Sequence, residues 1–466
     1  MDIDNSRDLY ASDFAGGLMG EKMKPNVLIM IADDATYNDL TLYGGQNVRT
    51  PNIDHLAQQG LVFNRAYLPM AMCNPCRTAL YTGLHPVRNG SCWNHSAARP
   101  GTKSIPHYLG DLSYRVGLCG KKHVMPTESF PFENVPGIEP SCVHPNPEFG
   151  VEGIREFIGR NTDEPFCLVT GLIEPHAPWT VGTPDHFDKD ALKLPPYMAD
   201  TPETREDYAM YLAEIEVLDQ EIGEILNVLD ETRQADNTLV IFTSEQGSQF
   251  PGCKWTNWNT GIHTGFVVRW PGQVAPGRTD AIVQYEDVVP TLVQVAGGDP
   301  KTMGFDGVSF LPVLQDGSED HREYSYFVHN NIPEGPPYPI RSVTDGTYHY
   351  IRNLTPDAIY IEKHLMGQNK WHQYWPTWVV DSTFNEHTRM VVNRYMHRPA
   401  EQLYRMDDDP YEMANLADDP EYAQEKKRLS VELDRWLKEQ GDPGAEIDTE
   451  EQWQAAKEGR HFERLV

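Results

Sequence analysis

The sequence predicts an α/β fold built on a mostly parallel sheet between layers of helices. Three continuous apolar runs support this prediction, at residues 26–32, 166–173 and 238–244. Runs of this length without polar alternation are typical of central strands covered on both faces. From Arg205 to Leu229, aliphatic residues recur every three or four positions, which predicts an amphipathic helix packed on such a sheet. We expect the acidic outer face of that helix to be solvated.

Composition sets the size of the fold and excludes one class of partner. The chain has 466 residues and a formal net charge of -30, from 39 Lys and Arg against 69 Asp and Glu. This length is enough for one large α/β domain and a smaller one. The acidic balance argues against nucleic-acid binding, because no excess of cations is present to displace phosphate counterions. A polyanionic ligand would need a local basic pocket.

Cysteine usage and apolar runs bear on the cellular compartment. The seven cysteines are an odd number in a large chain, so a disulfide framework is not expected, although one bridge stays open. No apolar run approaches the roughly 20 residues of a membrane span. Residues 1–24, an N-terminal extension, lack a charged segment followed by a long apolar one, so we expect no signal peptide there. Localisation stays open between the cytoplasm and export with a leader removed.

The first apolar run ends in two adjacent carboxylates, Asp33 and Asp34. The carboxyl end of a strand is where α/β folds place their sites. Adjacent carboxylates repel each other, and a bound cation is the simplest way to resolve that repulsion. Hard oxygen ligands suit Ca²⁺ or Mg²⁺. The alternative for this pair is a solvated loop after a strand.

The most informative motif begins at Cys73, with Pro75 at +2, Arg77 at +4, and Thr82 and Gly83 at +9 and +10. This pattern resembles the signature of the type I sulfatases. The resemblance implies that a formylglycine-generating enzyme oxidises Cys73 to formylglycine, whose hydrated aldehyde is the nucleophile. The alternative is a buried structural cysteine near a helix start. Arg77 lies one helical turn on, where it could hold an oxyanion or the hydrated aldehyde; a surface ion pair is the alternative.

A second motif, Gly-Lys-Lys-His, covers residues 120–123 and resembles the sulfatase Gly-Lys-x-His element. Alternate residues of an extended segment point the same way, so Lys121 and His123 could reach one site while Lys122 faces elsewhere. The residues that follow, 124–126, resemble the heparan N-sulfatase branch of the family. A lone Lys or His is more often structural.

The second apolar run leads into Glu174-Pro175-His176-Ala177-Pro178. Prolines on both sides of His176 stiffen the loop and present the imidazole. The block resembles the strand-end histidine that serves the leaving group in sulfatases. We expect Glu174 either to orient a site residue or to contact substrate, with an exposed loop carboxylate as the alternative.

The third apolar run ends in Glu245 and Gln246, where most sulfatases have Asp-Asn. The pair keeps a carboxylate and an amide, each longer by one methylene, a change that Ca²⁺ tolerates better than Mg²⁺. The resemblance implies a Ca²⁺ ion held by this pair together with Asp33, Asp34 and the modified Cys73, with Mg²⁺ less favoured.

Two further residues match or replace substrate contacts of the family. Lys254, seven residues beyond Gly247, matches the lysine that contacts sulfate. The usual Glu-Gly-Gly-Ile-Arg pattern becomes Asn-Thr-Gly-Ile-His at residues 259–263, which concerns substrate selection and places His263 among the candidate substrate contacts.

The resemblance assigns a role to each polar residue. Lys121 and Lys254 offset charge on the transferring group. His176, with Lys254, protonates the departing atom, and His123 is the base that breaks down the sulfated intermediate. Arg77 orients the hydrated aldehyde.

The remaining segments read as scaffold. Residues 50–67 predict a short helix leading into a strand, and residues 266–272 a strand and turn. Residues 287–292 and 306–312 resemble scaffold segments of the sulfatases.

The C-terminal third predicts a smaller unit. Residues 330–339 are rich in Pro and Gly and read as a linker. We therefore expect a catalytic domain over residues 25–334 and a C-terminal subdomain over residues 335–466. Its expected elements are a hairpin around Asp345-Gly346, a strand at 401–404 and a helix at about 421–438.

Trp371, Tyr374, Trp375 and Trp378 form an aromatic cluster in the C-terminal subdomain. Aromatic side chains can stack on sugars. Filling of the domain junction is the favoured interpretation, since buried aromatics dominate cores and interfaces.

The motifs stand in family order from about residue 25 to about residue 440. The resemblance implies an alkaline-phosphatase-like fold and hydrolysis of a sulfate ester. An O-sulfated saccharide is the first expected substrate, and an N-sulfamate, as in an N-sulfoglucosamine sulfamidase, is the second. A phosphonate or phosphate monoester hydrolase is the third possibility. The alternative outside the enzymes is a glycan-binding relative in which Cys73 is never oxidised.

Overall fold

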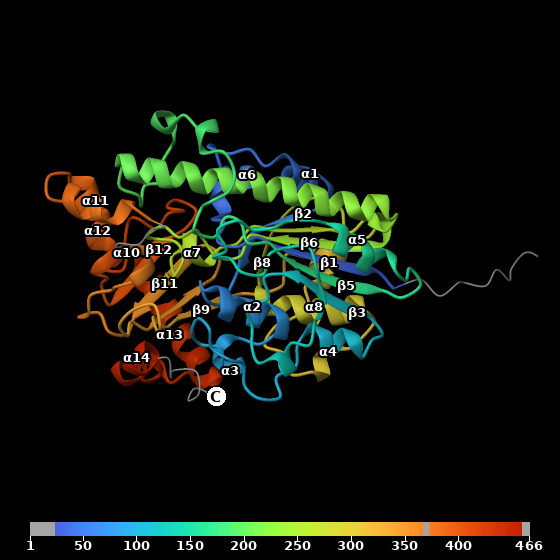
Figure 1. Ribbon diagram of the computed structural model, residues 1–466. Helices are drawn as coiled ribbons and strands as arrows, with labels where there is room; N and C mark the ends of the chain where they lie inside the picture. Colours follow the sequence, from blue (N-terminus) through green and yellow to red (C-terminus); the bar gives the residue numbers. More distant parts are fainter. Residues whose placement is uncertain (1–23, 367–371, 459–466) are drawn as a thin grey trace, which may run out of the picture.

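A mixed sheet forms the centre of the fold in the computed structural model, which describes residues 24–366 and 372–458 (Figure 1). Its strand order is β4-β3-β5-β1-β6-β7-β2-β8. Neighbours from β4 to β6 are parallel, β7 is antiparallel to both of its neighbours, and β2 and β8 are parallel. The predicted mixed, mostly parallel sheet is confirmed. The strands are β1 (Asn26–Ile31), β2 (Leu61–Tyr67), β3 (Arg115–Gly120), β4 (Glu133–Val135), β5 (Phe166–Gly171), β6 (Thr238–Thr243), β7 (Phe266–Arg269) and β8 (Gly277–Gln284).

The three apolar runs become β5, β1 and β6, which lie side by side at the middle of the sheet. Successive residues of β1 enter opposite cores: Leu28 and Met30 join one hydrophobic cluster, and Val27 and Ile29 join the other. Both faces of these strands are therefore covered, which is why their sequences lack polar alternation.

Helices cover the two faces of the sheet. The long helix α6 crosses one face together with α1 and α5, while α2, α4 and α8 lie on the other (Figure 1). Figure 1 also shows the C-terminal helices gathered at one end of the sheet. The helices of this part are α1 (Pro51–Gln59), α2 (Cys73–Thr82), α3 (Pro86–Asn89), α4 (Ile105–Gly110), α5 (Glu152–Gly159), α6 (Pro202–Glu231), α7 (Asn259–Ile262), α8 (Val288–Val295) and α9 (Leu311–Asp316).

Helix α6 confirms the predicted amphipathic helix, but its acidic residues are not all solvated. Asp207, Glu214 and Asp219 are buried. Each carboxylate accepts backbone N–H groups of another segment: Asp219 from residues 52 and 53 at the start of α1, Glu214 from residues 180 and 181, and Asp207 from residue 373. The expectation of a solvated acidic face is wrong for these three, because buried backbone donors need acceptors.

A second, antiparallel sheet stands in the order β12-β11-β10-β9, which confirms the predicted hairpin and final strand. Its elements and the helices around it are β9 (Ser325–His329), β10 (Ile340–Thr344), β11 (Tyr348–Asn353), β12 (Glu401–Arg405), α10 (Lys363–Met366), α11 (Tyr374–Asp381), α12 (Glu386–Met396), α13 (Ala423–Gln440) and α14 (Glu450–Lys457).

Residues 330–339 connect two adjacent strands of one sheet, β9 and β10, and are not a linker between separate units. The buried carboxylate of Asp448 accepts hydrogen bonds from the backbone N–H of Asn331 at 2.8 Å and of Tyr338 at 2.7 Å. The expected boundary at 334/335 falls inside this sheet. Pro and Gly mark irregular backbone, and that backbone is packed here instead of exposed.

The described aromatics of the C-terminal cluster fill the junction between α11 and α6. Tyr374, Trp375 and Trp378 are buried, and the indole N–H of Trp378 donates to Thr204 Oγ1 at 2.7 Å. Trp371 lies outside the described residues.

All seven cysteines are free thiols. Across the described ranges, no helix combines the length and apolar character that a membrane crossing requires. Residues 1–23 of the expected N-terminal extension lie outside the described residues.

Candidate active site

The carboxyl ends of the three central strands bring the polar motifs together. Asp33 and Asp34 follow β1, Glu245 and Gln246 follow β6, and all four side chains are fully buried. One ligand atom from each of Asp33, Asp34, Glu245 and Cys73 lies within 4.8 Å of the other three. We call these residues and Gln246 the acidic cluster.

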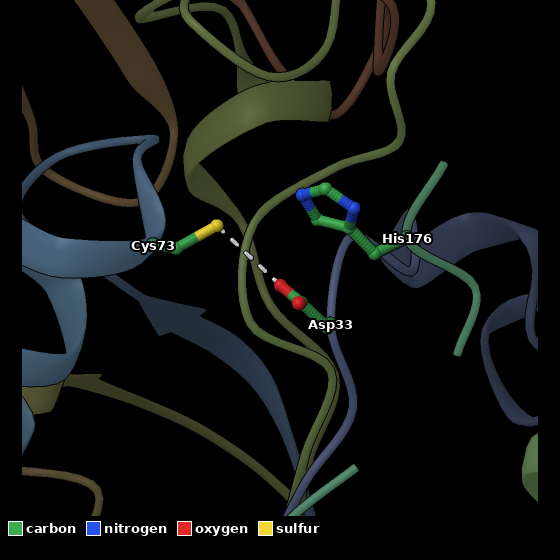
Figure 2. Close-up of side chains that lie close together, drawn as sticks. All are labelled: Asp33, Cys73 and His176. Carbon is green, nitrogen blue, oxygen red and sulfur yellow. Dashed lines mark hydrogen bonds between the residues drawn. The ribbon is translucent and has the colours of Figure 1, made fainter. Parts of the chain in front are cut away.

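Cys73 enters the acidic cluster as the first residue of α2, after an extended residue at Met72. Its Sγ lies 3.4 Å from Asp33 Oδ1 and 3.0 Å from Gln246 Nε2. Figure 2 shows the Cys73 and Asp33 side chains pointing toward one another, with the His176 imidazole beside them. The helix start therefore aims the predicted nucleophile at the predicted metal ligands.

Two buried lysines flank the cluster. Lys121 Nζ forms an ion pair with Asp33 Oδ2, and Lys254 Nζ donates to Asp34 Oδ2 at 2.7 Å. Both lysines are at most 2% exposed, so their charges act in a region of low dielectric constant, where electrostatic interactions are strong. Both predicted lysines therefore lie beside the same cluster, each paired with one of its carboxylates.

Arg77 is fully buried, which excludes a surface ion pair. Its Nε and Nη2 donate to the two carboxylate oxygens of Glu245 at 2.8 and 3.0 Å, and its Nη1 donates to the backbone oxygen of Lys121 at 2.9 Å. The guanidinium thus joins α2, the end of β6 and the loop after β3. It orients Glu245 directly, a contact that its spacing from Cys73 did not predict.

Burial and charge set the protonation of the cluster. Burial raises the pKa of Asp33, but Lys121 and other cations more than offset this and hold it well below its usual range. Burial raises the pKa of Asp34, with Lys254 offsetting only part of the effect. Burial and the Asp33 carboxylate raise the pKa of the Cys73 thiol well above its usual value. The thiol of Cys73 is therefore protonated at neutral pH, and a protonated thiol is a poor nucleophile.

The two predicted histidines have different polar neighbours. His176 Nε2 lies 3.5 Å from Asp34 Oδ2 and 3.3 Å from Gln249 Nε2. His123 Nε2 lies 2.7 Å from Nδ1 of His95. Burial lowers the pKa of both predicted histidines well below the usual value, helped by Lys254 for His176 and by Lys121 for His123.

Two candidate substrate contacts lie apart from the cluster. Glu174 is buried and its carboxyl group bonds to Glu221 of α6, so it is not an exposed loop carboxylate. His263 is buried and stacks on Tyr37 with 3.7 Å between ring centroids. In the described part of the chain, no hydrogen bond joins either side chain to the acidic cluster.

Sequence reasoning missed three polar neighbours of the site: His95, Gln249 and Cys76. Cys76 Sγ donates to Glu245 Oε1 at 3.1 Å and to Gln246 Oε1 at 3.3 Å. A backbone signal does mark the site, since strained conformations gather at functional positions. Among the described residues, five of the eight non-glycine positions with positive φ surround the cluster: Asp34, His95, His123, Glu245 and Trp255.

The comparison with known families decides what this constellation is. The Sulfatase family model matches residues 25–298. This chain belongs to the sulfatase family. It is therefore a sulfuric ester hydrolase. The family implies a metal ion and formylglycine in the site, and Asp33, Asp34 and Glu245 are acidic residues that could hold the metal.

Two curated relatives cover most of the sulfatase chain. An ulvan-active sulfatase of Formosa agariphila is 31% identical over 426 residues, which span 90% of this chain and 81% of that protein. The N-sulphoglucosamine sulphohydrolase of Homo sapiens is 27% identical, with 94% of this chain and 93% of that protein covered.

Solved structures confirm the alkaline-phosphatase-like fold of this sulfatase. A protein solved in complex with its substrate D-glucosamine-2-N,6-O-disulfate superposes with a TM-score of 0.69 at 20% identity, over 90% of this chain and 99% of that chain. The phosphonate monoester hydrolase of Agrobacterium radiobacter superposes with a TM-score of 0.64 at 20% identity, over 89% and 96%.

Proposed function

We propose that this protein hydrolyses sulfate esters of a sulfated saccharide, with residue 73 as formylglycine and with a bound Ca²⁺ ion. The observation that carries the proposal is the acidic cluster, whose four ligand atoms lie within 4.8 Å of one another beneath two buried lysines. An N-sulfamate substrate is the second candidate, favoured by the 27% identity to a human N-sulphoglucosamine sulphohydrolase over almost the whole chain.

The residues of the acidic cluster fit a hard cation. Asp33, Asp34 and Glu245 offer carboxylate oxygens and Gln246 an amide oxygen, all in a fully buried site, and this is the donor set that Ca²⁺ takes with flexible geometry. Residue 73 completes the set. When bound, the ion neutralises charge on the sulfate oxygens and lowers the cost of nucleophilic attack.

The setting of residue 73 supports an oxidised side chain. As a thiol, Cys73 is held protonated by burial and by Asp33, which disfavours thiolate chemistry. A hydrated aldehyde at this position supplies one hydroxyl group for attack and a second for release of sulfate.

The other residues act on charge and protons. Lys121 and Lys254 stabilise the charge that gathers on the sulfate oxygens. His176 donates a proton to the departing oxygen, and His123 accepts one in the release step. In the free protein the pKa of His176 is lowered by burial and Lys254. An anionic substrate beside the imidazole raises that pKa, so protonation of His176 accompanies binding.

Sulfate release tests the proposal. The protein is co-expressed with a formylglycine-generating enzyme, residue 73 is checked by peptide mass, and O-sulfated saccharides, N-sulfated saccharides and a phenyl phosphonate are offered. We expect sulfate from the O-sulfated set, none from Cys73→Ala, loss of activity on treatment with a chelator and recovery with Ca²⁺.

Each other outcome has its own meaning. Release from N-sulfated saccharides alone selects the second candidate, and cleavage of the phosphonate alone makes the protein a phosphonate hydrolase. No release from any saccharide by protein with confirmed formylglycine contradicts the proposal. An unmodified Cys73 that binds saccharides without turnover leaves a glycan-binding protein.

A further inference from the structure

Beyond the acidic cluster, polar contacts continue outward from His123. His123 Nε2 lies 2.7 Å from His95 Nδ1. The neighbouring residue Asn94 donates through Nδ2 to Glu334 Oε1 at 2.8 Å. Burial lowers the pKa of His95, and the charge of Glu334 offsets this only in part, while Lys121 and Lys254 lower it further.

A second set of contacts reaches Glu334 from Lys254. Lys254 Nζ lies 4.7 Å from the ring centroid of Trp255. The ring of His364 stacks on Trp255 with 5.7 Å between centroids and 16° between planes, and its Nε2 lies 2.7 Å from Glu334 Oε2. The two sets of contacts meet at Glu334. We call Glu334 and its neighbours Asn94, His95, Trp255 and His364 the rim, because they lie beside the site proposed for sulfate.

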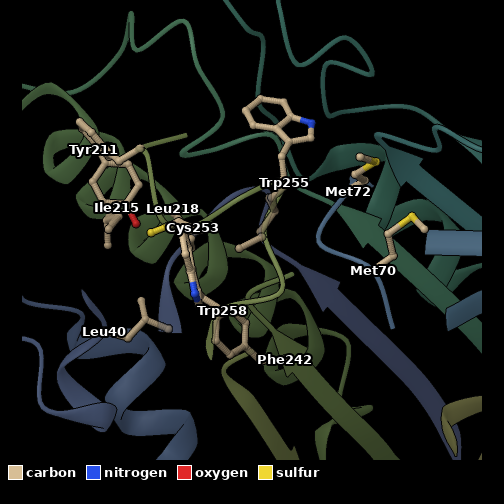
Figure 3. Close-up of a cluster of buried hydrophobic side chains, with 14 of the residues drawn as sticks. Leu40, Met70, Met72, Tyr211, Ile215, Leu218, Phe242, Cys253, Trp255 and Trp258 are labelled. Atoms are coloured by element: carbon tan, nitrogen blue, oxygen red, sulfur yellow. The ribbon is translucent and has the colours of Figure 1, made fainter. Parts of the chain in front are cut away.

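Trp255 anchors the rim to the main core. Its backbone N–H donates to Ala71, two residues before Cys73, at 3.0 Å. Its indole is buried, and Figure 3 shows it near Met70 and Met72 in the hydrophobic cluster. A side chain that stacks on this ring is therefore held in a defined place relative to residue 73.

The acidic and basic side chains of this region differ in how far they are exposed to solvent. Glu334 is 1% exposed. His364 and Lys363 keep side-chain exposures of 33% and 54%, with Lys363 Nζ 3.3 Å from Glu334 Oε2. Burial lowers the pKa of His364, but the bond and charge of Glu334 more than offset this and raise it. Two partly exposed basic side chains are thus paired with one buried carboxylate. Such a basic site contrasts with the net charge of -30 of the whole chain.

We infer that His364, held in place by Glu334, binds a second anionic group of the saccharide, next to the sulfate that is hydrolysed. A uronate carboxylate and a further sulfate are both anions, and a partly exposed imidazolium can donate a charged hydrogen bond to either. This inference rests on the proposed function. Glu334 is a positioning residue: its carboxylate oxygens accept hydrogen bonds from Asn94 and His364, and only His364 is proposed to contact the substrate.

A metal ion between Glu334, Glu362 and His364 is the competing interpretation, since their ligand atoms lie within 4.8 Å of one another. The hydrogen bonds argue against it. Both oxygens of Glu362 accept backbone N–H groups, from His364 at 3.0 Å and from Leu365 at 2.6 Å. The carboxylates are already satisfied, and the imidazole is bonded to one of them.

The first test compares matched saccharides on His364→Gln. One pair is a sulfated disaccharide with a uronic acid and its carboxyl-reduced analogue; a second pair differs by one additional sulfate. We expect His364→Gln to lower kcat/KM for the dianionic member of one pair about tenfold, through KM, as for loss of a charged hydrogen bond. The monoanionic member of each pair and nitrophenyl sulfate should change less than about twofold. The pair that responds identifies the group.

His186→Gln is the matched control, because His186 is also paired with a glutamate but its side chain is 60% exposed on another surface. We expect no change in substrate preference there. Equal losses of His364→Gln on all substrates would assign a structural role and overturn the inference, as would no loss on any.

Glu334→Gln tests the positioning role by pH. Among the described residues, the titratable groups that act on His364 include Glu334, Glu362 and Lys363, and also His372, whose pKa burial lowers to about 3. At pH 7.5 the preference of the variant for the dianionic substrate should fall, because the hydrogen bond and charge of Glu334 are what raise the pKa of His364. At pH 5.5 the preference should be larger than at pH 7.5, because a lower pH favours the protonated imidazole even where burial lowers its pKa. Wild type is measured at both pH values, because burial raises the pKa of Glu362 to about 7. A preference that is no larger at pH 5.5 than at pH 7.5 contradicts this role.

Binding separates failure of the inference from failure of the proposed function. If no substrate is turned over, calorimetry can still compare the affinities of the protein for the two members of each disaccharide pair, and this comparison tests the rim site. Tighter binding of a dianionic member, abolished in His364→Gln, supports the rim site without any sulfatase activity. Equal affinities within both pairs overturn it.

Discussion

Arg77 shows how much of the site depends on single side chains. Three of its guanidinium nitrogens have acceptors, two on Glu245 and one on the backbone of Lys121. Cys76, one residue earlier on α2, also donates to Glu245. The carboxylate is one methylene longer than the aspartate usual in the family, and these donors hold it in place.

We therefore predict that Arg77→Lys destabilises the fold strongly. Lysine cannot reproduce the two-point contact, and a buried carboxylate left unpaired costs about 3–5 kcal/mol. Urea unfolding at pH 7.5 measures the change. Arg160→Lys is the control, because Arg160 makes the same two-point contact with Glu133 at 2.6 Å, but with side chains 41% and 42% exposed. We expect less than about 1 kcal/mol there, and equal costs at both positions would contradict the argument.

At the residue scale, the ends of apolar runs pointed to Asp33 and Asp34, and the resemblance to sulfatases pointed to Cys73 and Lys254. A strand end positions the two aspartates, and a helix start positions Cys73 beside them. His95 was not predictable: it stands in an irregular loop, and its contact with His123 depends on a backbone turn with φ of 63°. Such a turn leaves no periodic pattern in the sequence.

Three buried acidic side chains join helix α6 to other segments: the start of α1, residues 180–181 and residue 373. The spacing of its apolar residues predicted the helix. The burial of Asp207, Glu214 and Asp219 was not predictable, because it depends on contacts with residues 373, 180 and 52 elsewhere in the chain. Tertiary contacts of this kind are not encoded in the helix itself.

We predict that Asp207→Asn changes how stability depends on pH. Burial raises the pKa of Asp207 to about 6, against about 3.9 in the unfolded chain. The folded form thus binds the proton more tightly, and stability is lost as pH rises from about 4 to about 6. Asparagine keeps the acceptor and removes this loss, so its stability relative to wild type should rise by about 3 kcal/mol over that range and then level off.

Urea unfolding of both proteins from pH 4 to pH 7.5 measures this difference. Glu224→Gln removes one acidic charge from the exposed face of the same helix and serves as the control. A difference between Asp207→Asn and wild type that does not change with pH would contradict the prediction.

At the scale of the whole molecule, the two sheets share one hydrophobic cluster. Leu28 of the large sheet and Val328, Tyr350 and Leu403 of the small sheet belong to it. The apolar strands of both sheets were predictable from their sequences. Their common core was not, because Pro and Gly at residues 330–339 suggested a break in the chain that the structure does not have.

We predict that both parts unfold in one transition. Trp378→Ala removes a fully buried indole between α11 and α6 and should cost about 3–5 kcal/mol. Circular dichroism and tryptophan fluorescence, followed in urea, should shift together, as in a two-state transition. Val380→Ala, at a side chain 62% exposed on the same helix, should stay within about 0.5 kcal/mol. Two separate transitions would show that the sheets are independent.

The hydrogen bonds that Asp448 accepts from residues 331 and 338 bear on the order in which parts of the site fold during synthesis. Asp448 follows Asn331 by 117 residues, a delay on the order of ten seconds on the ribosome. We expect the segment that carries Glu334 to become ordered only after that delay, because Asp448 accepts its backbone N–H groups. Cys73 is 1% exposed in the finished fold, yet its segment emerges long before its partners at residues 245, 246 and 254. We therefore expect that the oxidation of residue 73 proposed above takes place during synthesis, before these partners bury the side chain.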